Sequence, residues 1–377
     1  MKYYIIAGEA SGDLHGSNLI KQLHVQDAAA DIRCWGGDLM QQAGATLVKH
    51  YRNLAFMGFA EVVKNLPTIL QNIKLCKADI ATYRPDVLIL IDYPGFNLRI
   101  AKWAKQNGLR VIYYISPQVW AWKANRVVSM KQCIDVMLVI LPFEKAYFAD
   151  KWNWPVTYVG HPLVEVVDAC LNEPLQPLPA LLANPLPVIA LLPGSRKQEI
   201  AKKLPIMLSV CAHFPQYQFA VAQAPGQAAE FYAPFLEQYQ NVTLIQGKTY
   251  HLLRHSKAAL VTSGTATLET ALLGVPEVVC YKTSAISYSI GKRLVKIKFI
   301  SLVNLIMNQL VVKELIQDAL NTPNLVHALQ ELLDNSPQQQ QLQNQYRQLK
   351  QLLSQDGTAS EKAATLIVQQ VKDWQHL

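Results

Sequence analysis

Short, continuous apolar runs recur through the first half of the chain, and stretches with helical spacing separate them. Strands that are apolar on both faces and alternate with helices are typical of a parallel sheet covered on both sides. We therefore predict an α/β, doubly wound domain over residues 1–165. Its strands are expected at Tyr3–Ala7, Val87–Ile91, Val111–Ile115, Val136–Leu141 and Val156–Val159.

The same pattern restarts after a proline-rich segment. Six prolines stand from Pro162 to Pro187, a shift in composition that is typical of a connection between domains. Beyond it we predict a second Rossmann-like, doubly wound domain over residues 185–345. Its strands are expected at Val188–Leu192, Phe219–Ala222, Val242–Ile245, Ala259–Thr262 and Val278–Tyr281.

The final segment carries two amphipathic patterns. Leu342 and Tyr346 lie on one apolar stripe of a glutamine-rich helix, and Thr358 with Glu361 forms a capping-box pattern before another stripe. We expect these C-terminal helices, over residues 346–377, to pack back on the first domain.

Composition narrows the class of protein. Apolar residues make up 51% and charged residues 16%, which excludes an intrinsically disordered chain. No apolar run reaches the roughly 18 residues of a spanning helix, and the start, Met1–Asp13, does not read as a signal peptide. We therefore expect a cytoplasmic protein with reduced thiols. Its six cysteines lie far apart without Cys-x-x-Cys, so no zinc site is predicted.

Two segments suggest a membrane surface. Residues 56–70 are apolar with few charges, and Lys282–Lys313 holds six basic residues and no acidic one, in a chain of net charge +8. Basic residues interleaved with apolar ones fit contact with anionic lipid. A solvated basic helix remains the alternative. Nucleic acid is less favoured, because no groove-reading motif occurs.

The first predicted domain offers two strand ends with candidate chemistry. Glu9, Ser11 and Gly12 lie in a small-residue turn that opens a helix, where anions are favoured, although a tight turn capped by Ser11 or Asp13 fits equally well. The turn is not G-x-G-x-x-G, so the dinucleotide fingerprint fails. Asp92 ends the second apolar strand, where sites form in parallel sheets, and it is either a general base or a helix cap.

The loop Ser116–Lys123 follows the next strand and contains two tryptophans. With Lys123 and Arg126 nearby, these rings either stack on a sugar, lie at an interface or simply pack.

The second domain repeats the strand–turn–helix junction twice. Small residues at a helix start, an arginine suited to phosphate and a carboxylate one turn further suggest a diphosphate and its nucleoside at the carboxyl ends of the strands. No Asp-x-Asp occurs, so we expect no metal and no cofactor, with leaving-group charge met by protein groups. The residues concerned are Gly194, Ser195 and Arg196, then Ser263, Gly264 and Thr265, and finally Glu269.

In this order the motifs resemble those of bacterial lipid-A-disaccharide synthase, from about residue 3 to residue 318. The motifs that carry the resemblance are AGEASGD, MGFAEV, RPDVLILIDYPGFN, YYISPQVWAW, LPFEKAYF, VGHPL, LLPGSR, SGTATLE and the stretch from KRLVK to SLVNLI. The glutamine-rich tail matches no motif of the family.

The resemblance implies an inverting hexosyltransferase with two Rossmann-like domains (GT-B type). It would join UDP-2,3-diacylglucosamine to 2,3-diacylglucosamine 1-phosphate in lipid A biosynthesis and release UDP. It would work as a peripheral protein on the inner face of the inner membrane of a Gram-negative cell. The resemblance leaves a homodimer open.

Residue by residue, the resemblance makes Asp92 the catalytic base and Arg196 a residue important for activity. It places Asn304 near the nucleotide and assigns Glu9 and Ser11 to the first-loop motif. The family's usual proline before that asparagine is Val303 here. Two rivals share the fold or the ligands: a UDP-N-acetylglucosamine 2-epimerase or N-acetylglucosaminyltransferase, and a non-catalytic binding protein, which has no use for Asp92.

Overall fold

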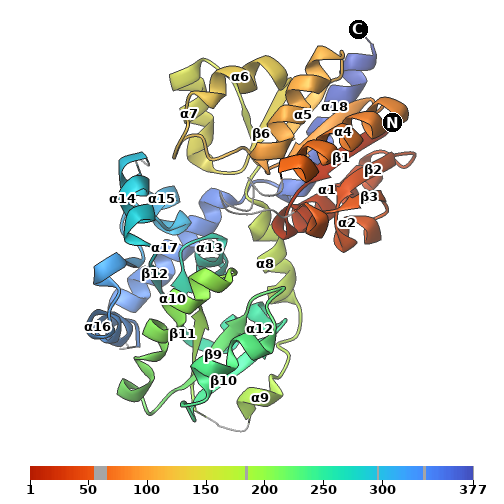
Figure 1. Ribbon diagram of the computed structural model, residues 1–377. Coiled ribbons are helices and arrows are strands. Elements are labelled where there is room, and N and C mark those ends of the chain that lie inside the picture. Colours follow the sequence, from red (N-terminus) through yellow and green to blue (C-terminus); the bar gives the residue numbers. More distant parts are fainter. Residues whose placement is uncertain (55–65, 183–185, 295–296, 334–336, 377) are drawn as a thin grey trace. The chain divides into compact units, whose positions relative to one another are not determined.

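The computed structural model describes residues 1–377 except 55–65, 183–185, 295–296, 334–336 and 377 (Figure 1). The chain forms two compact units. The first joins Met1–Pro162 to Leu353–Leu377, and the second is Leu163–Leu352. Each unit is built on its own parallel sheet.

The first unit holds a seven-stranded sheet in the order β3-β2-β1-β4-β5-β6-β7, and every neighbouring pair is parallel. The order reverses between β1 and β4, which creates the crevice where doubly wound sheets bind ligands. The strands are β1 (Lys2–Ala7), β2 (Asp31–Gly36), β3 (Thr46–His50), β4 (Val87–Ile91), β5 (Val111–Tyr114), β6 (Val136–Val139) and β7 (Thr157–Tyr158).

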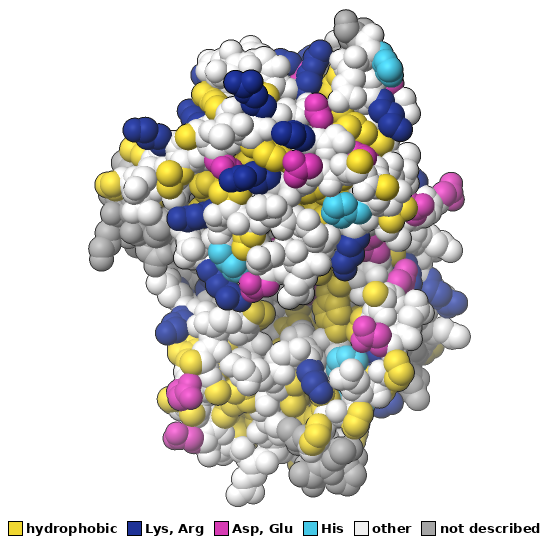
Figure 2. Space-filling view, turned by 90° about the vertical axis from the view of Figure 1, so that its right-hand side faces the viewer, with side chains coloured by type: hydrophobic (Ala, Val, Ile, Leu, Met, Phe, Trp, Pro, Cys, Tyr) yellow, Lys and Arg dark blue, Asp and Glu magenta, His cyan; other side chains and the backbone are white. Residues whose placement is uncertain are grey.

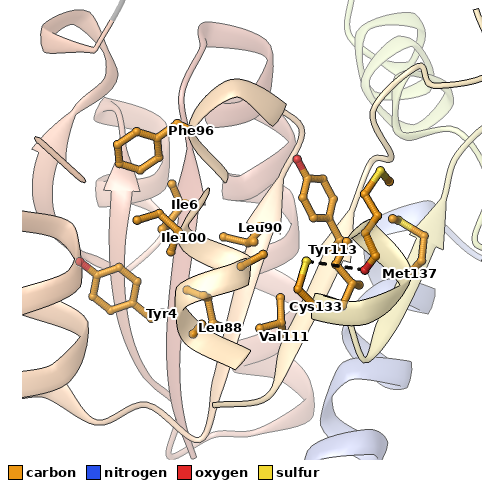
Figure 3. Close-up of a cluster of buried hydrophobic side chains, with 14 of the residues drawn as sticks. Tyr4, Ile6, Leu88, Leu90, Phe96, Ile100, Val111, Tyr113, Cys133 and Met137 are labelled. Atoms are coloured by element: carbon orange, nitrogen blue, oxygen red, sulfur yellow. Dashed lines mark hydrogen bonds between the residues drawn. The ribbon is translucent and has the colours of Figure 1, made fainter. Parts of the chain in front are cut away.

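Helices cover both faces of this sheet. Successive strand residues point to opposite faces, so Tyr4 and Ile6 pack under α4–α7 while Tyr3 and Ile5 pack under α1 and α18. Figure 3 shows the first of these clusters, with Tyr113 of β5 beside Cys133 of α6. The helices are α1 (Ala10–Gln26), α2 (Asp38–Gln42), η1 (Tyr51–Asn53), α4 (Leu66–Tyr83), α5 (Pro94–Gln106), α6 (Arg126–Cys133), α7 (Pro142–Trp152) and α18 (Ala359–Gln375).

The second unit holds a six-stranded parallel sheet in the order β10-β9-β8-β11-β12-β13. Its order reverses between β8 and β11. The strands are β8 (Val188–Leu192), β9 (Gln218–Gln223), β10 (Val242–Gln246), β11 (Ser256–Thr262), β12 (Glu277–Tyr281) and β13 (Lys313–Ile316). Its α-helices are α8 (Pro162–Asn172), α9 (Pro179–Leu182), α10 (Lys197–Leu208), α11 (Ala233–Leu236), α12 (Thr249–His255), α13 (Thr265–Leu272), α14 (Ala285–Leu294), α15 (Leu302–Met307), α16 (Thr322–Leu333) and α17 (Pro337–Leu353).

The predicted fold class, two doubly wound α/β domains with C-terminal helices, is confirmed. The first unit leaves off at Pro162 and the second spans Leu163–Leu352, where the sequence suggested 165 and 185–345. The proline-rich segment contains α8 and α9, because Pro162 and Pro179 stand at the first position of a helix, where proline is well tolerated. Residues 346–352 belong to α17 of the second unit, whereas α18 packs on α1 of the first.

Candidate functional site

Asp92 lies in an unusual backbone conformation at the carboxyl end of β4. Its φ is 43° and that of Tyr93 is 48°, two successive left-handed residues outside glycine. The Asp92 carbonyl accepts hydrogen bonds from the Asn97 side chain at 2.8 Å and from the Tyr113 hydroxyl. Such strain persists only where surrounding contacts over-determine it, and it concentrates at functional sites.

The Asp92 carboxyl has a perturbed pKa. Burial raises it, and the negative charge of Glu9 raises it further, to about 6, against a hydrogen bond from the backbone of Tyr93. Glu9 precedes α1, and β1 pairs with β4 so that Ala7 lies beside Ile91. The two carboxyls therefore share the point where the strand order reverses. A carboxylate poised near neutral pH suits a general base.

The glycines of the first loop serve packing. A Cβ on Gly8 would lie 2.2 Å from the Tyr93 ring, and one on Gly12 would lie 3.0 Å from the Ala7 Cβ. The sequence predicted room for an anion in this turn, but protein atoms fill the space beside Gly8 and Gly12. Ser11 is exposed and Glu9 half-buried at the start of α1.

The sequence leaves Asp13 open as a cap of α1, but the residue before that helix is Glu9 and Asp13 lies within it. Its buried carboxylate accepts hydrogen bonds from the backbone N–H groups of Gly37, Leu39 and Met40 at 2.7–3.2 Å. It therefore anchors the start of α2 instead.

In the second unit, the strand ends enclose a cavity of about 410 Å³. It lies where the sheet order reverses, between β8 and β11. The structure thus brings together residues that the sequence proposed from separate motifs. The cavity is lined by, among others, Gly194, Ser195, Ser263, Gly264, Thr265 and Glu269.

The start of α13 leaves space for a ligand. Gly264 adopts φ 157° and ψ −163°, which is close to a glycine-only region, and no atom lies within 4 Å of where its Cβ would be. The Ser263 hydroxyl is already used, since it donates to the Ile300 carbonyl at 2.9 Å. Backbone N–H groups at this helix start are suited to an anion.

Glu269 is held in place by Tyr250, a residue that the sequence analysis missed. The Tyr250 hydroxyl donates to Glu269 Oε1 at 2.8 Å. Burial raises the pKa of Glu269, and this hydrogen bond lowers it. Nothing in the pattern around Tyr250 marks it, because it follows an ordinary strand-to-helix turn.

Arg196 begins a row of charges on α10. It lies 3.6 Å from Glu199 Oε1, and Lys203 lies 4.0 Å from Glu199 Oε2. Lys203 is almost fully buried, so desolvation lowers its pKa while Glu199 raises it. A Cβ on Gly194 would meet Lys203 Nζ at 3.5 Å. Glu199 Oε2 would lie closer still to that Cβ, at 2.8 Å, so a carboxylate and a buried cation border the Gly194 turn, and the sequence analysis identified neither.

Asn304 does not present its side chain to a ligand. Its oxygen accepts from the N–H groups of Val311 and Val312, and its amide nitrogen donates to the Val312 carbonyl and to Glu314, all at 2.8–2.9 Å. The buried amide is thereby fully satisfied. These contacts fasten α15 to the segment that leads into β13, and the position near the nucleotide that the resemblance implies stays a prediction.

Among the residues that the structure describes, no three or more His, Cys, Asp or Glu side chains gather as metal ligands would. No helix in the described part of the chain has the length and apolarity to cross a bilayer.

Solved structures resemble the whole chain. A UDP-GlcNAc 2-epimerase from Neisseria meningitidis superposes with a TM-score of 0.67 at 14% identity, covering 99% of this chain and 100% of its own. The glycotransferase of kitacinnamycin superposes with a TM-score of 0.68 at 15% identity, covering 98% and 99%. The chain therefore has the GT-B fold of nucleotide-sugar enzymes. At these identities the fold alone is shown, and the epimerase rival stays open on this ground.

Sequence comparison removes that ambiguity. The family model for lipid-A-disaccharide synthetase matches residues 3–368. Lipid-A-disaccharide synthase 1 of Legionella pneumophila (strain Lens) is 38% identical, covering 93% of this chain and 92% of its own. Lipid-A-disaccharide synthase of Syntrophus aciditrophicus (strain SB) is also 38% identical, covering 98% and 97%. The chain belongs to the lipid-A-disaccharide synthetase family, and is a glycosyltransferase of lipid A synthesis. The resemblance found in the sequence is confirmed.

Proposed function

We propose that the chain transfers 2,3-diacylglucosamine from its UDP derivative to the 6-hydroxyl of 2,3-diacylglucosamine 1-phosphate, with inversion at the anomeric carbon. The observation that carries this proposal is Asp92, which lies where the strand order of the first unit reverses. Its backbone is strained, and its carboxyl has a pKa of about 6. A binding protein or an epimerase needs no base for an acceptor hydroxyl. Family membership supports the donor and acceptor classes.

The reaction is a single displacement. The acceptor 6-hydroxyl gives its proton to the Asp92 carboxylate as its oxygen bonds to the anomeric carbon. The bond from that carbon to the diphosphate oxygen breaks, and its electron pair leaves with UDP. Above pH 6 the Asp92 carboxylate is ready to accept the proton.

The leaving group is assigned to the second unit. The Gly194–Arg196 turn and the start of α13 supply backbone N–H groups and a guanidinium for the diphosphate. Glu269 accepts hydrogen bonds from the ribose hydroxyls, steadied by Tyr250. Preorganised donors of this kind stabilise charge as it develops and need no metal ion.

Measurement of UDP release from the acylated donor tests this function. Release should depend on the phosphorylated acceptor and should yield a disaccharide by mass spectrometry. Interconversion of the donor sugar without an acceptor would favour an epimerase. Donor binding without turnover would favour a binding protein.

We also propose that the protein works peripherally on the inner face of the inner membrane. Leu70 and Leu75 are exposed on α4, and Arg293 and Lys298 are exposed in the basic segment. Most of residues 56–70, and residues 295–296, lie outside the described part of the chain. Figure 2 shows Lys and Arg side chains, together with Asp and Glu, interspersed with apolar ones on the face it presents. A homodimer remains a prediction.

Vesicle binding tests the membrane proposal. Sedimentation with phosphatidylglycerol vesicles should weaken as salt rises, since each basic residue near an anionic surface adds about 1 kcal/mol that salt screens. Leu70→Ser with Leu75→Ser should reduce the salt-resistant remainder. Equal binding to neutral and anionic vesicles would count against the electrostatic part.

A further inference from the structure

An exposed tryptophan with two cations stands beyond the carboxyl end of β5. The Trp122 side chain is 44% exposed. Lys123 Nζ lies 4.1 Å from the centre of its ring, and the Arg126 guanidinium lies 5.9 Å away. In the described part of the chain, neither cation forms an ion pair with a carboxylate. Two neighbouring positive charges without an acidic partner favour an anion.

The loop that presents this tryptophan is held firmly. The buried Glu144 carboxylate of α7 accepts hydrogen bonds from Ser116 Oγ at 2.6 Å and from Trp120 Nε1 at 3.2 Å. The Trp120 ring meets Phe143 edge-on, with centroids 5.0 Å apart. Because these contacts fix the loop from Ser116 to Trp120, the exposure of Trp122 is a feature of a well-anchored loop.

The cluster follows β5, the strand that pairs with β4, and the proposed base Asp92 directly follows β4. Burial raises the pKa of Tyr113 well above its ordinary value, the charge of Asp92 raises it further, and the charge of Arg126 lowers it. The same Tyr113 hydroxyl donates to the Asp92 carbonyl. Because β4 and β5 are neighbouring parallel strands, Asp92 and the segment that carries Trp122 and Arg126 both follow strand ends at one edge of the sheet.

We propose that Trp122, Lys123 and Arg126 bind the phosphate and sugar face of the acceptor. The guanidinium fork and the ammonium take the phosphate dianion, and the indole takes the flat face of the sugar. This inference rests on the proposed function. In that reaction one sugar ring carries both the hydroxyl that Asp92 deprotonates and the phosphate. The two binding sites must therefore lie on the same side of the molecule, and Asp92 and the Trp122 cluster follow the paired strands β4 and β5 at one edge of the sheet.

A double cycle, in which changes to the acceptor are combined with changes to the enzyme, tests the proposal in the full-length protein. Acceptors with and without the 1-phosphate are compared in detergent, with no bilayer present. Arg126→Gln and Lys123→Gln should each raise KM for the phosphorylated acceptor about 10- to 100-fold, as expected for losing a charged hydrogen bond. The same variants should leave KM for the donor unchanged. With the phosphate-free acceptor, wild type and variants should be equally poor.

Lys151→Gln is the matched control. Lys151 lies 5.4 Å from the Tyr147 ring in the same unit, and its removal should not change KM for either acceptor. Arg126→Lys should restore part of the lost affinity, which a merely structural role would not predict. Thermal melting confirms that each variant folds.

Other outcomes overturn the inference. If wild type turns over both acceptors equally, the protein does not recognise the phosphate, although the transferase function stands. If the variants keep KM in detergent but lose binding to phosphatidylglycerol vesicles, the cluster binds bilayer phosphate instead. If neither acceptor gives UDP release, the proposed function fails and this inference falls with it.

Discussion

Asp92→Asn removes the ability of this side chain to accept a proton and leaves its place in the structure unchanged. Asparagine has the same shape and, like aspartate, tolerates a left-handed backbone, so the φ of 43° is preserved. It cannot accept the hydroxyl proton. Loss of a general base typically costs about 10²–10⁴-fold in rate, and we expect kcat to fall within that range while donor affinity persists.

The same substitution should stabilise the fold. The Asp92 pKa rises from 3.8 to about 6 on folding, so the folded chain holds this proton more tightly than the unfolded chain does. Stability is therefore lost as pH rises from about 4 to about 6 and stays lower above that. At about 1.36 kcal/mol per pKa unit, the cost at pH 7.5 is at most about 3 kcal/mol. Asp92→Asn should remove this cost and raise the melting temperature.

The pH profile of kcat/KM, followed by UDP release from pH 5 to pH 8, checks the cause of the shift. The acidic limb should have its midpoint near 6. Glu9→Gln should move this midpoint downward, but not back to the ordinary value of 3.8, because burial is the larger cause and Glu9 the second. An Asp92→Asn variant that keeps most of its kcat would refute the role of Asp92 as the base. A midpoint that is the same in Glu9→Gln as in wild type would refute the effect of Glu9 on the Asp92 pKa.

Four further outcomes are expected. Arg196→Ala should lower kcat about 10²–10³-fold, and Arg196→Lys should recover little, because an ammonium does not replace a planar fork; wild-type kcat in Arg196→Lys would contradict this. Activity should survive excess EDTA. If EDTA instead abolished activity and added magnesium restored it, a metal would take part in the reaction. Tyr250→Phe should raise the pKa of Glu269, because the variant loses the hydrogen bond that lowers it. As pH is lowered, UDP binding measured by calorimetry should then be lost at a higher pH than in wild type. An unchanged pH profile of UDP binding would exclude this coupling. Burial raises the pKa of Glu277 well above its ordinary value of 4.5, so stability should fall as pH rises above that value, and Glu277→Leu should weaken this pH dependence in thermal melts.

The sequence revealed most strands but missed β2, β3 and β13, which mix charged or half-buried residues with apolar ones. Strand β2 mixes Asp31 and Arg33 with its apolar residues, and β3 is only partly buried at the edge of the sheet. β13 begins with a lysine and a glutamate at the edge of the other sheet. Charged and half-buried positions interrupt the apolar run, so the hydrophobic pattern of these three strands is weak.

The candidate site followed the same logic. Asp92 could be predicted because an acid directly after a continuous apolar strand lies at a carboxyl edge in any parallel sheet. Gly8 could not be interpreted, because the Tyr93 ring that fills the space beside it is distant in sequence. The partners of Asn304 are near in sequence, but no hydrophobic pattern shows that the chain turns back there and brings Val311 and Val312 to its side chain. Lys203 escaped notice because a lysine on a helix is ordinarily solvated, and only the packed structure reveals its burial.

The packing of α18 on α1 has a consequence for biosynthesis. Ile367, Val368 and Val371 complete the apolar layer beneath β1 and α1, and burial of such side chains contributes about 1.5–3 kcal/mol each. The ribosome makes these residues only after all of Leu163–Leu352. The second unit can therefore fold while the first still lacks one wall, and the nascent first unit exposes an apolar groove through that interval. Chaperone binding to ribosome-bound chains should accordingly persist until α18 emerges.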